Sequence, residues 1–201
     1  MSVRGRGNRD SGGPPGFTAE RSVYESRGRY VLPVHRPRRA RALHPYDRGW
    51  PRIFAAERWR IQAALGSSAA AVEHVGSSSV PGLCGRREID ILVGARSRAD
   101  VESGTRVLTG LGYVTDDIAR IGPEPWSLLS KPGPIPFELL IVEHGGGLWK
   151  RHLQLRDYLL GDPERAQHYA RLKLRWAARY GADTPGYKEA KRRFWVSVAP
   201  A

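Results

Sequence analysis

The chain has 201 residues, 40% of them hydrophobic, and a formal net charge of +13; this is enough for one domain with a core. No stretch approaches the ~18 uncharged apolar residues of a membrane span, and the single cysteine excludes an intramolecular disulfide and a cysteine-based zinc site. We therefore expect a cytoplasmic protein with no membrane anchor. Its positive charge favours polyanionic partners such as nucleotides or nucleic acid, although a solvated arginine-rich surface explains the same charge.

The N-terminal segment differs in composition from the rest of the chain. The first 48 residues contain eleven arginines and four acids, a surplus of seven positive charges. Residues 1–44 are rich in Gly, Pro and Arg and have few periodic apolar positions, so we expect a disordered tail with one candidate strand at 30–34. The tail is either an arm that binds nucleic acid or a plain flexible extension. The folded domain is expected to comprise residues 45–201.

The first predicted element of the domain is a helix that starts at Pro51 and ends before Gly66, with apolar side chains every three or four residues. Apolar runs and one amphipathic segment then predict further elements. In chain order these are strands at 71–75 and 89–93, a helix at 97–111, and strands at 113–115, 126–130 and 137–142. A proline-rich connection joins the last two strands, and the order indicates a mixed α/β sheet.

The C-terminal third is predicted to be helical. Two helices are expected at 147–160 and 162–180, and a last one starts near residue 184. Asp162 followed by Pro163 is typical of a helix start. The carboxylate accepts hydrogen bonds from the unpaired backbone N–H groups of the first turn, and the N–H that proline lacks would have no partner at that position.

The turn Gly76-Ser77-Ser78-Ser79 lies between two predicted strands and has the composition of an anion-binding loop. Glycine lets backbone amides approach a phosphate closely, and the serine hydroxyls donate further hydrogen bonds to its oxygens. Asp90 lies on the next strand, where a carboxylate can hold Mg²⁺ against the same phosphates. The two strands thus predict a phosphate site beside a metal ligand.

The run EHVGSSSVPGL, followed by an Ile-Asp-Ile strand, closely resembles the signature of the GrpB family. That signature reads roughly EHxGSTSVPGL, a Lys-Pro pair, and then two hydrophobic residues, Asp and a hydrophobic residue. The resemblance covers about residues 46–198 and extends to Trp50-Pro51, Leu155-Arg156-Asp157-Tyr158-Leu159, Tyr169, Leu172-Lys173, Tyr187 and Lys191. The family resembles a branch of the nucleotidyltransferase superfamily, which implies a mixed sheet flanked by helices with a C-terminal helical segment.

The sequence departs from these patterns around the predicted metal ligand. Arg86-Arg87 replaces Lys-Pro, and Leu92 stands where the superfamily has a second acid after Asp90. Glu88 can supply that acid instead, because side chains two residues apart lie on one face of a strand. Glu138 falls where the family usually carries histidine, and it either completes an acid triad or is an ordinary outward-facing glutamate. Asp90, Glu88 and Glu138 are thus the candidate catalytic carboxylates, with Asp90 and Glu88 as metal ligands.

The resemblance also implies basic residues in the nucleotide site. Arg156, Lys173 and Lys191 match family positions and would neutralise a triphosphate, together with the loop residues 76–79. The alternative for the two lysines, which lie on aromatic helix faces, is that they extend along apolar surface with the ammonium in water. Further candidates are His74, which as a lone histidine is more often structural, Arg87 and Tyr187.

Taken together, the sequence predicts a nucleotidyltransferase-like protein that binds NTP and Mg²⁺. Its reaction would be transfer of a nucleotidyl group to a small-molecule acceptor, or activation of that acceptor. The alternative is a catalytically inactive nucleotide- or RNA-binding or regulatory module of the same fold, because Leu92 replaces the second acid.

Overall fold

The computed structural model describes residues 42–121, 124–182 and 184–198. The chain divides into two units, residues 1–31 and 32–201, and every described residue belongs to the second unit. The predicted tail up to residue 41, with its candidate strand at 30–34, lies outside the described residues. The domain boundary at 44 and 45 therefore stays a prediction.

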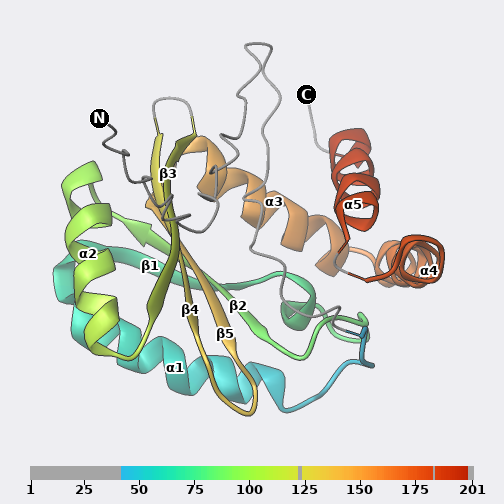
Figure 1. Cartoon of the computed structure of the whole chain (residues 1–201), viewed down its shortest axis with the longest axis horizontal. Helices are drawn as coiled ribbons and strands as arrows, with labels where there is room; N and C mark the ends of the chain where they lie inside the picture. The colour runs from blue at the N-terminus through green and yellow to red at the C-terminus, as the bar shows by residue number, and fades with distance from the viewer. Residues whose placement is uncertain (1–41, 122–123, 183, 199–201) are drawn as a thin grey trace, which may run out of the picture. The chain divides into compact units, whose positions relative to one another are not determined.

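A five-stranded mixed sheet forms the centre of the second unit, in the order β1-β2-β5-β4-β3 (Figure 1). The strands are β1 (Ala69–Val75), β2 (Ile89–Ala95), β3 (Val114–Ile121), β4 (Glu124–Lys131) and β5 (Phe137–Glu143). Strands β2 and β5 pair in parallel, and the other neighbours are antiparallel. The predicted α/β class with a mixed sheet is confirmed.

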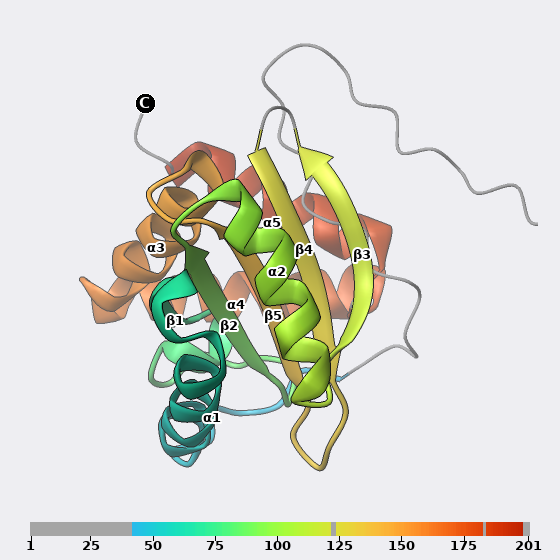
Figure 2. The same cartoon turned by 90° about the vertical axis from the view of Figure 1, so that its left-hand side faces the viewer.

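Five helices flank this sheet: α1 (Trp50–Leu65), α2 (Arg98–Gly110), α3 (Gly147–Leu160), α4 (Pro163–Tyr180) and α5 (Pro185–Val198). Helices α1 and α2 cover one face of the sheet, as Figure 2 shows. Helix α3 packs on the opposite face. Helix α4 packs against α3, and α5 packs against α4. The predicted C-terminal helical segment is confirmed.

The central strand β2 has apolar side chains on both faces, as expected for a strand covered by helices on both sides. Ile89, Ile91 and Val93 belong to the core under α1 and α2, whereas Leu92 belongs to the core under α3. Because strand side chains alternate, Asp90 lies on the same face as Leu92. The acidic end of β2 therefore faces the side of α3.

The helix ends follow the predicted signals, whereas every strand extends beyond its predicted bounds, β3 most of all. The side chains of Ser97 and Asp162 accept hydrogen bonds from the first-turn amides of α2 and α4. Strand β3, expected only at 113–115, continues to Ile121 because its backbone pairs with β4 along that length. Its polar sequence lacks the apolar alternation that would have indicated this.

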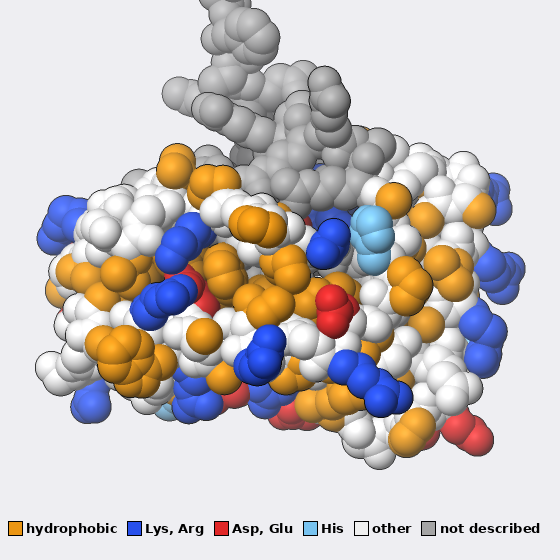
Figure 3. All heavy atoms as spheres, turned by 90° about the horizontal axis from the view of Figure 1, so that it is seen from below, with side chains coloured by type: hydrophobic (Ala, Val, Ile, Leu, Met, Phe, Trp, Pro, Cys, Tyr) orange, Lys and Arg blue, Asp and Glu red, His pale blue; other side chains and the backbone are white. Residues whose placement is uncertain are grey.

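The distribution of charged side chains and the hydropathy of the helices both concern the partners that the chain can have. Lys and Arg side chains lie scattered among hydrophobic and polar ones on the face seen in Figure 3, and do not gather in one patch there. Among the helices that the structure describes, none combines the length and the hydropathy needed to cross a bilayer.

Candidate functional site

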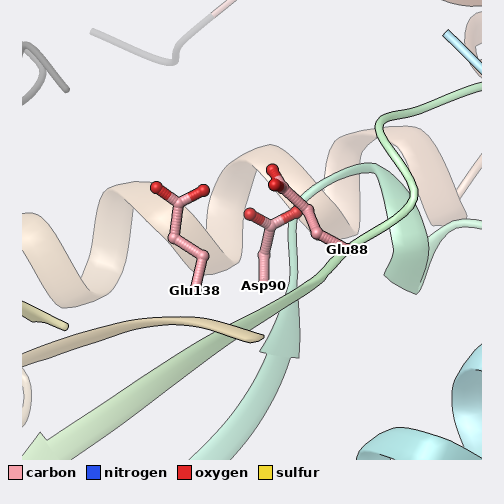
Figure 4. A group of neighbouring side chains, drawn as sticks. All are labelled: Glu88, Asp90 and Glu138. Carbon is pink, nitrogen blue, oxygen red and sulfur yellow. The ribbon is translucent and has the colours of Figure 1, made fainter. Parts of the chain in front are cut away.

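The carboxylates of Glu88, Asp90 and Glu138 meet at one end of the sheet (Figure 4). Each contributes one oxygen, and these oxygens lie within 4.8 Å of one another. Asp90 pairs with Glu138 in the parallel register of β2 and β5, and Glu88 lies two residues before Asp90. The side chain of Glu138 is only 11% exposed. The interpretation of Glu138 as an ordinary outward-facing glutamate is therefore wrong.

Burial makes this cluster electrostatically unusual. Burial raises the pKa of Glu88, and the charge of Asp90 raises it further. Burial likewise raises the pKa of Asp90, and the charge of Glu138 adds to this effect. Three close carboxylate oxygens are the hard ligands that Mg²⁺ prefers, so the donor set fits that ion. Leu92, which stands where the resemblance implies a second acid, is instead fully buried in the core under α3.

A guanidinium group already contacts these acids. Nη2 of Arg86 lies 2.5 Å from Oε1 of Glu88 and 3.0 Å from Oε2 of Glu138. Arg86 is absent from the site that the sequence predicts, where it stands only as part of the pair that replaces Lys-Pro. The position of Arg86 two residues before Glu88 is the one feature of the sequence that could have placed it in the site. The predicted candidate Arg87 is exposed instead.

The glycine of the loop lies directly against Asp90. Gly76 has a φ of +70°, and a Cβ built on it would lie 2.1 Å from Oδ2 of Asp90. Only glycine therefore allows the loop backbone to pass this close to the carboxylate. The predicted phosphate loop and the predicted metal ligand are thus in direct contact.

The serine hydroxyls of the loop are used within the protein. Ser78 is buried, and its Oγ lies 3.1 Å from Nε2 of His74 and accepts from the amide of Asp90 at 3.5 Å. The Ser79 hydroxyl donates to the Gly76 carbonyl at 2.7 Å. In this arrangement the hydroxyls of Ser78 and Ser79 hold the loop in shape, and a ligand role for them stays a prediction.

Lys173 reaches the loop from α4. It is 2% exposed, and its ammonium donates to Oγ of Ser77 at 2.5 Å and to the carbonyl of Cys84. The interpretation in which the Lys173 ammonium extends into water is therefore wrong. Burial, followed by the charge of Lys191, lowers the pKa of Lys173 to about 7.

Lys191 and Tyr187 approach the same region from α5. Burial and the nearby Arg86 lower the pKa of Lys191, while the acids led by Asp90 oppose this effect. The Lys191 ammonium lies 5.7 Å from the centre of the Tyr187 ring, and Tyr187 is itself buried. Lys191, and Lys173 below its pKa of about 7, therefore contribute positive charge beside the carboxylates.

Arg156 lies by the strand that leads into the loop. Its guanidinium pairs with Glu73 at 2.7 Å and Asp157 at 2.8 Å, and donates to the His74 carbonyl at 3.2 Å. The guanidinium of Arg156 would therefore have to leave one or both of these carboxylates in order to contact a nucleotide, and that contact stays a prediction. Glu73, the first residue of the signature run and not itself a predicted site residue, is its partner from a distant segment of the chain.

His74 has the surroundings of a structural residue. Its ring stacks on Phe54, with 4.5 Å between ring centres, and burial, aided by the Arg156 charge, lowers its pKa to about 4. The imidazole is therefore neutral near pH 7, as the structural interpretation requires.

Comparisons with known proteins agree with this architecture. A family model described as GrpB protein matches residues 41–199. A UPF0157 protein of Deinococcus radiodurans is 32% identical over 198 residues, which cover 96% of this chain and 95% of that protein. The crystal structure of the conserved protein GrpB from Enterococcus faecalis matches with a TM-score of 0.66 and 25% identity, over 78% of this chain and 95% of the other. The Cid1 poly(U) polymerase with bound Mg and 3'-dATP shares the fold, with a TM-score of 0.52 and 16% identity over 74% of this chain and 49% of that one.

Proposed function

The chain belongs to the GrpB family, and we propose that it is a nucleotidyltransferase-like protein that binds an NTP together with Mg²⁺. It transfers a nucleotidyl group to a small-molecule acceptor or activates that acceptor. The observation that carries the proposal is the contact between the Gly76 loop and a cluster of three carboxylates. The fold shared with a polymerase that was crystallised with Mg and a nucleotide supports it.

The roles follow from the chemistry of the side chains. Asp90, Glu88 and Glu138 are the groups that would hold Mg²⁺, which supplies charge neutralisation at the phosphates when bound. The backbone of residues 76–79 offers amides to the phosphate oxygens. Lys191 adds positive charge where negative charge develops during transfer.

The alternative function is a nucleotide- or RNA-binding module without catalysis. Two observations favour it: Leu92 fills the place of the second acid with core packing, and Arg86 pairs with Glu88 and Glu138. Such a module would bind its ligand through basic groups, and its affinity would depend little on Mg²⁺.

Calorimetric titration of ATP, GTP, CTP and UTP, with Mg²⁺ and with EDTA, tests the proposal. At least one nucleotide should bind in a Mg²⁺-dependent way, and Asp90→Asn, nearly isosteric, should abolish that dependence. Glu102→Gln is the matched control, because it also turns a carboxylate into an amide but lies exposed on α2. Equal Mg²⁺-dependent affinity in the parent and Asp90→Asn overturns the metal role, and binding that ignores Mg²⁺ favours the module.

A further inference from the structure

We propose that Arg86 is an internal counter-ion of the carboxylate cluster, and that a divalent cation must displace its guanidinium in order to bind. The inference rests on the proposed function, because it concerns the metal that the cluster would hold. It adds a determinant of metal affinity that lies in the connection before β2, outside the acids themselves.

The contacts place the guanidinium between two of the three acids. A single nitrogen, Nη2 of Arg86, lies 2.5 Å from Glu88 and 3.0 Å from Glu138. These two acids come from segments far apart in the sequence, one before β2 and one on β5. Arg86 therefore ties the two segments together through charge-assisted hydrogen bonds.

A metal ion would compete with Arg86 for the same carboxylates. Mg²⁺ binds oxygen at about 2.0–2.1 Å, so an ion shared by these acids must lie within a few ångströms of each carboxylate. The three oxygens lie within 4.8 Å of one another, and Nη2 is in hydrogen-bond contact with two of the three residues. A guanidinium and a metal ion held by these acids would compete for two of the three carboxylates, and their positive charges repel each other.

Charge explains why the cluster carries an internal cation. Removing one partner of a buried ion pair is costly, because the remaining charge is left without compensation. Glu88 is 3% exposed, and Asp90 and Glu138 lie beside it. In the absence of a metal, Arg86 supplies part of the positive charge that these acids require.

The position of Arg86 makes displacement possible without unfolding. Its side chain is 21% exposed, whereas Glu88 is buried. It also lies outside every helix and strand, so the guanidinium can move toward solvent while β2 and β5 stay paired.

Binding of Mn²⁺ alone, followed by the electron paramagnetic resonance signal of the free ion, tests this inference with the full-length protein. We compare the parent with Arg86→Ala and Arg87→Ala. Arg87 is the matched control, because it is the adjacent residue, carries the same charge and is exposed. Arg86→Ala should bind Mn²⁺ at least tenfold more tightly than the parent, about 1.4 kcal/mol, whereas Arg87→Ala should change affinity by less than about threefold.

Thermal unfolding supplies a second readout that does not depend on activity. In EDTA, Arg86→Ala should melt at a lower temperature than the parent, and saturating Mn²⁺ should raise its melting temperature more than that of the parent. If Arg86→Ala does not fold in EDTA, Arg86→Gln replaces it, since the amide keeps a hydrogen-bond donor without the charge.

The outcomes separate this inference from the proposed function. Equal or weaker Mn²⁺ binding by the Arg86 variant, with the parent still binding, overturns the counter-ion role and leaves the metal site standing. Absence of binding by the parent and by the variants overturns both. Adding Asp90→Asn to Arg86→Ala should remove the gain; if the gain persists, the ion binds elsewhere and the inference fails.

Discussion

Lys173 carries the prediction with the largest stability effect. Its ammonium is buried under the loop and donates to Ser77 and Cys84, and burial lowers its pKa from 10.5 to about 7. The unfolded chain keeps the ordinary pKa, so between pH 7 and 10.5 the unfolded state binds more protons than the folded state. The contribution of Lys173 to stability therefore rises with pH through this window, and is lowest and flat below pH 7.

The magnitude follows from the size of the shift. One pKa unit corresponds to about 1.4 kcal/mol, so the free energy of unfolding should gain about 1 kcal/mol per pH unit from this group between pH 7 and 10. Lys173→Met keeps the length and apolar surface of the side chain but cannot titrate. The parent should thus become more stable relative to Lys173→Met by roughly 3 kcal/mol from pH 7 to pH 10.

Urea unfolding of both proteins at pH 6, 7, 8, 9 and 10 measures this difference, and subtraction removes the titration of the groups that do not interact with Lys173. The exposed Lys150→Met is the control, because it makes the same substitution at the surface. A difference between the parent and Lys173→Met that stays constant from pH 7 to 10 would refute a buried, titrating ammonium under the loop.

Two further predictions concern the loop and the tail. Gly76→Ala should lower the free energy of unfolding more than Gly82→Ala does, because both glycines have positive φ but only at Gly76 would a Cβ collide with Asp90; equal decreases in urea unfolding would contradict this close approach. Deleting residues 1–44 should flatten the salt dependence of RNA binding by about 0.7 log units for each phosphate that the tail neutralises, whereas an unchanged slope, or no RNA binding by the full-length protein, would leave the tail a plain extension.

The helices could be predicted from local signals, because their ends depend on neighbouring residues. Pro51, Gly66, Asp162 and Gly181 mark helix starts and ends in the sequence, and the structure begins or ends helices within a residue of each. The full length of β3 could not be predicted in this way, since it depends on backbone pairing with β4. Such pairing is not recorded in the side-chain pattern of a polar segment.

The candidate site was only partly predictable, for the same reason. The sequence alone supports Glu88 and Asp90 on the same face, because side chains two residues apart along an extended backbone point the same way, although Glu88 itself precedes β2. The position of Glu138 opposite Asp90 could not be predicted, because it depends on the parallel register of β2 and β5, which pairs residues far apart in the chain. The internal use of the Ser78 hydroxyl likewise depends on where the His74 ring lies.

The departures from the family signature gain a common explanation in three dimensions. In the signature that the sequence resembles, a lysine takes the place of Arg86 and a hydrophobic residue that of Glu88, and the resemblance implies a histidine in place of Glu138. In the structure these three residues meet at a single guanidinium nitrogen. Two added carboxylates raise the negative charge beside Asp90, and the guanidinium offsets part of it with two directed hydrogen bonds, which the point charge of a lysine supplies less well. The three substitutions therefore form one electrostatic unit, and a change at any one of them should alter the effect of changes at the other two.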